Sequence, residues 1–231
     1  MTGALRVGQV STGYWRSSVQ DEAMQDEHGF IWQAMLDTID IELGGARVLD
    51  AGCNRGGFLR MLVDGAGIAE GYGYDPAFAA VADARELSGD RPLTFEAAHA
   101  IPAGWGGFDV AFSHEVLYLL ADLRVHAEDM LAALRPGCPY FAVMGVHAGS
   151  QMMAAWHAAN ADHLDLPDLH DLDEVAGVFE EAGFEVGVAR LRFRFVPVSA
   201  HRARPADRDR LVEWLDYYSD DKVMFRFTRP S

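Results

Sequence analysis

The chain has 231 residues, half of them hydrophobic, which is enough for one sizeable α/β core. The 35 acidic residues outnumber the 19 basic ones, and the formal net charge of -16 at pH 7 repels phosphate backbones, which argues against nucleic acid as a partner. Because the sequence has no apolar run of about 18 residues and residues 1–15 lack a secretory signal pattern, we expect a cytoplasmic protein with no membrane segment.

The N-terminal part of the chain is predicted to contain a helix. Apolar residues recur at helical spacing within residues 26–43: Phe30, Ile31, Met35, Leu36 and Ile39. The segment precedes the first predicted strand. We therefore expect residues 1–43 to form a cap segment over the ligand-binding edge of the fold.

The middle of the chain alternates between strand and helix patterns. Five short runs have strand composition: 46–52, 71–75, 93–98, 108–113 and 140–145. Helical patterns lie between them, at 56–64, 76–88 and 115–137, and the last is long enough for two helices. Pro76 suits the first turn of its helix. This alternation indicates βα units and a parallel sheet.

The C-terminal part predicts a helix at 171–184, with an acidic start and a glycine near its end. Residues 184–200 alternate between apolar and polar side chains and predict one long half-buried strand. Its antiparallel partner is predicted at 222–230, and a helix capped near Ala206 or Asp207 lies between them. We expect a single domain, 1–231, with insertions at 150–170 and 204–221.

The stretch VLDAGCNRGG runs from the first predicted strand into a glycine-rich turn. Gly52 and Gly56 lack side chains where a cofactor approaches the backbone, and Asn54 tolerates a positive φ. A dinucleotide would bring its pyrophosphate to this turn, where Asp50 would oppose it. S-adenosylmethionine brings a sulfonium and an ammonium instead. Asp75, which ends the second strand, suits the ribose hydroxyls of either cofactor.

These motifs resemble those of the class I S-adenosylmethionine-dependent methyltransferases. The family's first motif, D/E-x-G-x-G-x-G, is matched by Asp50, Gly52 and Gly56, with Asn54 at the middle glycine. Asp75-Pro76, FDVAFSHEVLYLL and LRPGCPYFAVMG match later motifs in the same order. The resemblance implies a doubly wound, mostly parallel seven-stranded sheet of the Rossmann-like methyltransferase fold. Helices are expected on both faces, with an antiparallel C-terminal strand pair.

The resemblance also implies which residues contact S-adenosylmethionine. Many relatives carry an acidic residue in the third strand that contacts the adenine amino group, but here Ala97 and Ala98 stand there, with Glu96 and His99 as candidate replacements. Arg16 is a candidate partner of the methionine carboxylate. The expected cofactor-binding residues are Asp50, Gly52, Cys53, Asn54, Gly56, Asp75, Pro76, Ala98, His99, Ser113 and Arg16.

Two histidines are candidates for catalysis. His114 follows the fourth predicted strand at the cofactor edge and could act as a general base, or instead cap a helix or line the pocket. His147 follows the fifth strand and could contact substrate, or be an ordinary loop histidine. Glu115 is interpreted as an acid in the first turn of a helix. Cys53 has no histidine or basic partner beside it, so we expect it to pack within the loop; it and Cys138 form no CxxC pair.

The segment 151–170 mixes methionine, tryptophan and histidine, which suits a flexible lid over substrate or, equally, a surface helix packed on the core. Its histidines and carboxylates match no metal-ligand spacing, so no metal site is expected. Together these patterns predict a methyltransferase that acts on a small-molecule acceptor, at an O, N, C or S atom. The alternatives are a non-catalytic S-adenosylmethionine-binding module and a nicotinamide-dependent oxidoreductase, which Asp50 and the absent GxGxxG spacing disfavour. The oligomeric state stays open.

Overall fold

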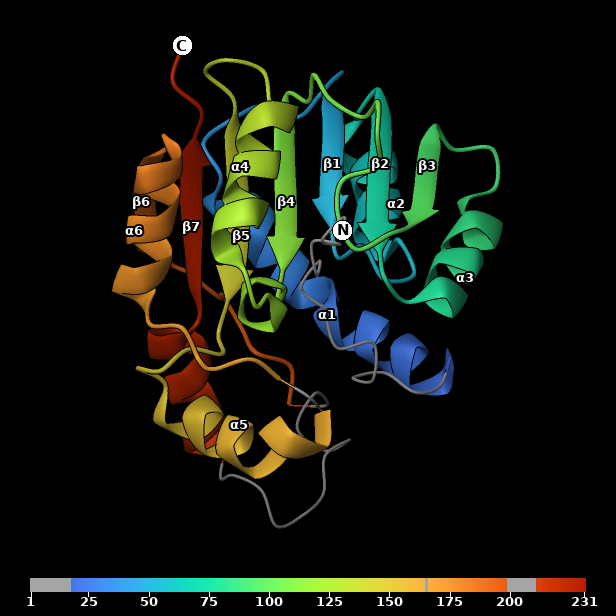
Figure 1. Ribbon diagram of the computed structural model, residues 1–231. Helices are drawn as coiled ribbons and strands as arrows, with labels where there is room; N and C mark the ends of the chain where they lie inside the picture. Colours follow the sequence, from blue (N-terminus) through green and yellow to red (C-terminus); the bar gives the residue numbers. More distant parts are fainter. Residues whose placement is uncertain (1–17, 165, 199–210) are drawn as a thin grey trace, which may run out of the picture.

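The computed structural model describes residues 18–164, 166–198 and 211–231 (Figure 1). Its centre is one seven-stranded sheet with the order β3-β2-β1-β4-β5-β7-β6. The strands are β1 (Arg47–Ala51), β2 (Glu70–Asp75), β3 (Leu93–Ala97), β4 (Val110–His114), β5 (Pro139–Met144), β6 (Glu185–Arg190) and β7 (Val223–Thr228).

The first five strands are parallel, and β7 is antiparallel to both β5 and β6. In Figure 1 the arrowheads of β1 and β4 point to one edge, while the arrowhead of β7 points to the other. This arrangement confirms the predicted mostly parallel sheet with an antiparallel C-terminal pair. The carboxyl ends of β1 to β5 and the first residue of β7 therefore meet along one edge, called the carboxyl edge below.

Helices connect the strands. They are α1 (Ser18–Thr38), α2 (Gly57–Met61), the π-helix η1 (Leu62–Ala66), α3 (Phe78–Ser88), the 3₁₀ helix η2 (Leu117–Leu119), α4 (Leu123–Ala133), α5 (Gln151–Leu164), α6 (Leu172–Ala182), α8 (Leu211–Asp216) and the π-helix η3 (Tyr217–Asp221). The predicted cap at Ala206 or Asp207 lies outside the described residues.

Local signals in the sequence set several of these helix ends. The carboxylate of Asp171 accepts a hydrogen bond from the Glu174 backbone N–H at 2.6 Å, which satisfies one open donor at the start of α6. Gly183 ends the same helix with a φ of 105°, a conformation that a side chain disfavours. The acidic start and terminal glycine predicted for this helix are both confirmed.

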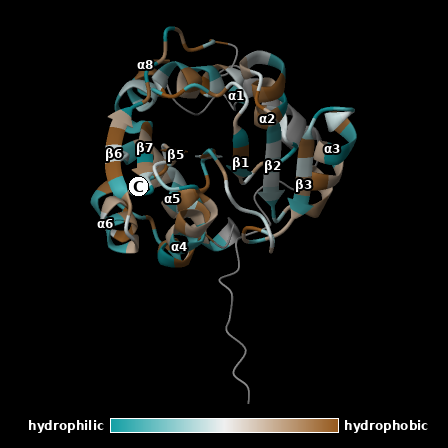
Figure 2. Cartoon of the chain, turned by 90° about the horizontal axis from the view of Figure 1, so that it is seen from above, coloured by the Kyte–Doolittle hydropathy of each residue, from teal (hydrophilic) through white to brown (hydrophobic). Residues whose placement is uncertain are grey.

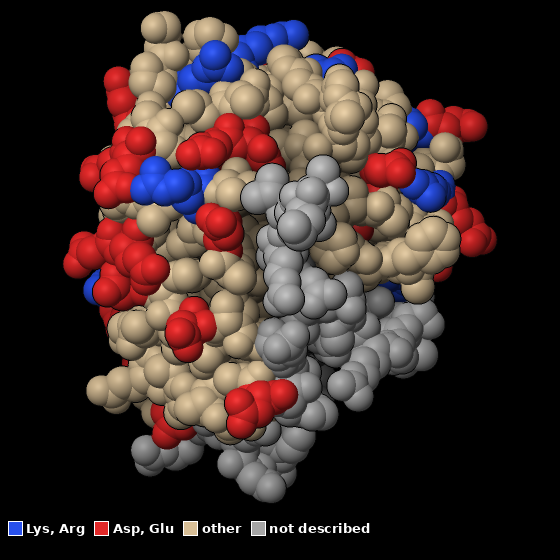
Figure 3. All heavy atoms as spheres, in the orientation of Figure 1, with Lys and Arg blue, Asp and Glu red and all other residues tan. Residues whose placement is uncertain are grey.

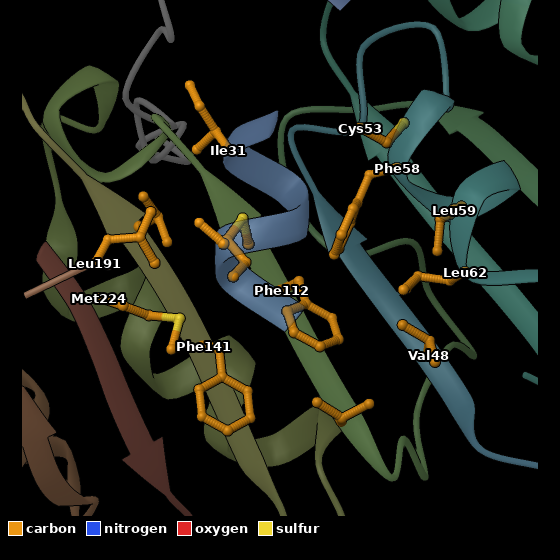
Figure 4. Close-up of a cluster of buried hydrophobic side chains, with 14 of the residues drawn as sticks. Ile31, Val48, Cys53, Phe58, Leu59, Leu62, Phe112, Phe141, Leu191 and Met224 are labelled. Carbon is orange, nitrogen blue, oxygen red and sulfur yellow. The ribbon is translucent and has the colours of Figure 1, made fainter. Parts of the chain in front are cut away.

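The core lies on both faces of the sheet because successive strand residues alternate between them. Val48 and its neighbours on one face pack against α1, α2, α3 and η3, whereas Leu49 and its neighbours on the other face pack against α4 and α6. Figure 2 shows these two helical layers, and Figure 4 shows part of the first cluster, to which Ile31 of α1, Phe58 of α2 and Phe112 of β4 contribute side chains. Sandwiching of the sheet between helices explains its apolar strands.

The long strand predicted over 184–200 is wrong in extent. Strand β6 ends at Arg190, and its residues are mostly exposed rather than half buried. Its partner β7 begins at Val223, directly after η3, so within the described residues β7 has no further backbone to pair with residues beyond Leu191. Phe193 then packs against Phe30 of α1 and Tyr218 of η3, with ring centroids 5.6 and 5.1 Å away. Aromatic packing thus replaces strand pairing there.

Two smaller boundaries also differ from the predictions. Helix α3 begins at Phe78, with Ala77 as its N-cap, so Pro76 precedes the helix instead of standing in its first turn. Strand β4 begins at Val110, and Phe108 makes only an isolated bridge to Leu134. In the described part of the chain, no helix is both long and apolar enough to cross a bilayer. Figure 3 shows acidic side chains scattered over the face it draws, with basic ones beside several of them.

A stacked aromatic pair provides a test of this core. Phe227 of β7 is fully buried and stacks on Phe179 of α6, with ring centroids 3.7 Å apart. We expect Phe227→Ala to lower the free energy of unfolding by about 3–5 kcal/mol, because it leaves a cavity between β7 and α6. Phe195, which is 88% exposed, offers a matched control. Urea titration should show a change within about 0.5 kcal/mol for Phe195→Ala. Equal losses in the two variants would contradict the packing described.

Candidate active site

The loop between β1 and α2 has an unusual backbone. Gly52, Asn54 and Gly56 have φ values of 76°, 46° and 70°, all in the left-handed region. The backbone N–H groups of Gly52 and Cys53 both donate to the Tyr74 carbonyl, at 2.9 and 3.1 Å. These bonds fix the loop against the end of β2. The positive φ of Asn54 agrees with the tolerance expected from the sequence.

The glycines in this loop serve packing inside the protein. A Cβ at Gly52 would lie 2.4 Å from Cγ2 of Val116, and one at Gly56 would lie 2.4 Å from the Phe95 ring. The close approach of a cofactor to Gly52 and Gly56, expected from the sequence, stays a prediction. Cys53 is buried, and its side chain fills the space that a Cβ at Gly73 would need. This contact agrees with the packing role expected for Cys53.

Asp75 is held at the end of β2 by two backbone donors. Its Oδ2 accepts a hydrogen bond from the Asn54 N–H at 2.9 Å, and its Oδ1 accepts one from the Ala77 N–H at 2.8 Å. These bonds join the glycine loop to the loop before α3. Because a carboxylate oxygen can accept more than one hydrogen bond, this geometry suits a diol such as a ribose.

Asp50 lies at the end of β1 and is only 4% exposed. Burial, together with the nearby Asp75 carboxylate, raises the pKa of Asp50 to about 8. A buried acid beside a second acid is destabilised as its charge develops, and a bound cation would offset this cost. The site thus favours a positively charged ligand at the end of β1.

His114 ends β4, directly beside the glycine loop. The preceding residue, Ser113, pairs with Ala51 of β1 in the sheet. The glycine loop begins directly after Ala51, so His114 lies next to it. The Nε2 atom of His114 is buried and has no hydrogen-bond partner among the described residues. Burial, then His28 and Lys222, holds the pKa of His114 well below its usual range. The imidazole is therefore neutral at pH 7 and can accept a proton.

An ion pair that the sequence did not predict lies next to His114. Lys222 is only 2% exposed, and its ammonium forms an ion pair with Glu115. The other carboxylate oxygen of Glu115 accepts a hydrogen bond from the Gly145 N–H at 3.2 Å. Glu115 has a φ of 58°, a conformation uncommon for residues with a side chain. The interpretation of Glu115 as a first-turn helix acid is therefore wrong. In the sequence, only its position directly after His114 could have marked it.

His147 is buried below the loop after β5. Its Nε2 and the Asp221 carbonyl oxygen are 2.9 Å apart, while its Nδ1 is buried without a hydrogen-bond partner in the described residues. The Ser150 hydroxyl donates to the Asp221 carboxylate at 2.6 Å. These contacts connect the start of α5 to the start of β7. They give His147 a role in joining two loops, and its predicted substrate contact stays a prediction.

The remaining residues predicted to bind the cofactor differ in location and burial. Ala98 and Pro76 lie half-buried at the carboxyl edge, and His99 is exposed there. The carboxylate of Glu96 pairs with Arg85 instead of facing the loop. Ser113 is fully buried, and its hydroxyl lies 2.6 Å from that of Tyr140 in the core, so its contact with the cofactor stays a prediction. Arg16 lies outside the described residues.

Helix α5 and the loop after it occupy residues 151–170. Met153 and Trp156 pack against the core cluster formed with α4 and α6. His157 Nε2 lies 2.8 Å from the Pro167 carbonyl oxygen, and His170 Nε2 lies 3.1 Å from that of Leu120. These contacts match those of a surface helix packed on the core. Across the described residues, no three His, Cys, Asp or Glu side chains gather as metal ligands would.

The sequence is similar to known methyltransferases. Residues 21–187 match the family model described as a methyltransferase domain. A malonyl-[acyl-carrier protein] O-methyltransferase of Legionella pneumophila is 26% identical over 165 residues, which are 68% of this chain and 58% of that protein. The chain thus spans less than two thirds of that relative's length.

Solved structures share the fold at lower identity. The chain solved in complex with the Trm112 methyltransferase activator of Haloferax volcanii is 20% identical, with a TM-score of 0.81 over 96% of this chain and 99% of that one. A geranyl diphosphate C-methyltransferase from Streptomyces coelicolor, solved with S-adenosyl-L-homocysteine, is 14% identical, with a TM-score of 0.68 over 96% and 88% of the two chains. These likenesses are evidence for the fold alone.

The strand order, the loop after β1 and the acidic ends of β1 and β2 define an α/β enzyme of the S-adenosylmethionine-dependent methyltransferase class. Because the family match covers more than half of its length, the chain belongs to the methyltransferase domain family. Its cofactor is S-adenosylmethionine.

The site's residues fit this cofactor. Asp50 is a buried carboxylate with a raised pKa, which a sulfonium or an ammonium nearby would stabilise in its charged form. Asp75 is oriented by two backbone bonds and suits the ribose hydroxyls. A pyrophosphate would bring further negative charge to the same two acids. The nicotinamide alternative therefore fits the site poorly.

The burial of Asp50 makes stability depend on pH. Its pKa of about 8 in the folded protein lies above the value of 3.8 for an unperturbed aspartate, so the ligand-free protein should lose stability as pH rises from about 4 to 8. We expect Asp50→Asn to raise the melting temperature at pH 8 by several degrees, with the gain shrinking toward pH 4. Thermal unfolding of both proteins across this range measures the effect. A variant that melts lower than the wild type at pH 8 would contradict the account.

Proposed function

We propose that this enzyme transfers a methyl group from S-adenosylmethionine to a small-molecule acceptor bound at the carboxyl edge, with His114 contacting the acceptor. The observation that carries the proposal is the buried Nε2 of His114, which lacks a hydrogen-bond partner among the described residues and lies beside the glycine loop. A buried polar atom of this kind normally has a partner, so a ligand group is a natural candidate.

The chemistry explains why few catalytic groups are needed. Bound S-adenosylmethionine supplies a methyl group already activated by its sulfonium. The protein must then hold the acceptor atom in line with that methyl and exclude water. Asp50 and Asp75 would orient the cofactor, and His114, neutral at pH 7, would accept the proton of an acceptor hydroxyl or amine as the new bond forms.

A small acceptor suits the surroundings of His114. The His28 ring of α1 lies 4.6 Å from the His114 ring, and the buried Lys222 pairs with the half-buried Glu115 beside it, so protein groups crowd this part of the edge. The net charge of -16 disfavours nucleic acid as the acceptor. Similar proteins are named for methyl transfer to an oxygen and to a carbon, and the proposal therefore leaves the acceptor atom open.

Two variants separate binding from chemistry. We expect His114→Gln to bind S-adenosylmethionine within about threefold of the wild type and to lose methyl transfer by roughly 10²–10⁴-fold, because it removes the base but not the cofactor contacts. Asp50→Asn should instead weaken cofactor binding by about 30-fold or more, because it removes a buried charge that faces a cation.

Calorimetry with the cofactor, followed by turnover on a panel of small hydroxyl and amine acceptors, measures both effects. Thermal unfolding of each variant serves as the control for folding. Full turnover by His114→Gln on an acceptor that the wild type methylates would contradict the role given to His114. Methylation of proteins or RNA, with no small molecule accepted, would contradict the acceptor class.

A further inference from the structure

A second histidine lies against His114. The ring of His28, on helix α1, meets the ring of His114 edge-on, with centroids 4.6 Å apart and planes at 77°. The two residues are far apart in the sequence, and only the docking of α1 on the carboxyl edge brings them together. In the sequence, no motif marks His28, which is one of several polar residues in an ordinary helix pattern.

The position of His28 is fixed by the packing of α1. Ile31 and Met35 follow His28 by three and seven positions, so they lie on the same face of the helix. Both are buried in the core cluster with Phe112 and Phe141. The Trp32 ring, one helical turn after His28, lies 6.2 Å from the His28 ring at an angle of 76°. These contacts leave the His28 ring little freedom to move away from His114.

The charges around His114 favour its neutral form. His28 acts on it from α1, and Lys222 acts on it from the start of β7. Glu115, the next residue in the chain, forms an ion pair with Lys222, which offsets its negative charge. Two imidazoles in contact, beside a buried ammonium, resist carrying positive charge together.

We propose that His28 is a positioning residue for the methyl transfer proposed above: its ring fixes the orientation of the His114 imidazole and keeps a proton off it, so that His114 meets the acceptor as a base. This inference rests on the proposed function for its catalytic meaning. The contact between the two rings does not depend on it. His28 acts through His114 and needs no contact of its own with the acceptor.

Removal of the His28 imidazole should change the pKa of His114 in a defined direction. When His28 becomes Phe, the edge-on ring contact remains but the titratable group is lost, so the lowered pKa of His114 should rise toward its usual range. The rise is partial, because burial, the largest cause of the lowered pKa, is unchanged. His28→Leu loses both the charge and the ring edge.

The test is a pH titration of the histidine rings by NMR in the ligand-free protein. The signals of His114 are identified by their loss in His114→Gln. We expect His114 to titrate at higher pH in His28→Phe than in the wild type, and to stay unchanged in His170→Phe, which removes an imidazole that bonds Glu174 and Leu120. An unchanged His114 titration in His28→Phe would overturn the inference.

Kinetics then show whether the pair serves catalysis. In His28→Phe the acid limb of kcat/KM should move to higher pH, with a plateau within about threefold of the wild type. In His28→Leu the plateau should fall by about tenfold or more, because the ring orientation is lost. Equal plateau losses with unmoved limbs would mean that His28 only packs. If the NMR titration shifts while the acid limb does not, the ring pair stands and His114 is not the base, so the proposed function fails separately.

Discussion

The active site depends on two carboxylates that end neighbouring strands. Asp50 is almost fully buried, and the nearby Asp75 adds to the cost of its charge, so the pKa of Asp50 rises to about 8. By linkage, such a shift corresponds to several kcal/mol of stability that the ligand-free protein lacks at high pH. The hydrophobic core packed on both faces of the sheet supplies the stability that offsets this loss. A bound cationic cofactor would stabilise the charged form of Asp50 and so gain affinity from this unfavourable burial. Active sites are commonly destabilised in this way before the ligand binds.

The remaining parts of the site follow from the order of the strands. Because β1 lies between β2 and β4, the acids that end β1 and β2 lie on one side of the glycine loop and His114 lies on the other. Antiparallel β7 brings Lys222 to the same edge, where it pairs with Glu115 and ties the loop after β4 to the end of β5. Helix α1 then places His28 on His114. Residues from separate parts of the chain, from α1 to the start of β7, thus meet at one edge.

The sequence was most informative where the physics is local. Strands β1 to β5, the glycine loop, the capped helix α6 and Asp75 all carry short-range signals, and each was predicted near its observed position. It failed where long-range packing decides. Alternation over 184–200 predicted a long strand, but β7 begins at Val223, so among the described residues the strand pairing of β6 with β7 stops at Arg190. Ser113 and Tyr140 bond inside the core, and His28 meets His114 only through the docking of α1. No local pattern encodes these contacts.

The central claim is that the cofactor's positive charge meets the buried Asp50. Isothermal titration of the protein with S-adenosylmethionine at pH 7, in buffers with different ionisation enthalpies, tests it directly. Since Asp50 is mostly protonated before binding and charged afterwards, the account predicts tight binding with release of a proton, so the measured enthalpy should change with the buffer. The release should vanish in Asp50→Asn. An enthalpy that is the same in every buffer, or binding of a nicotinamide dinucleotide in place of S-adenosylmethionine, would contradict the account.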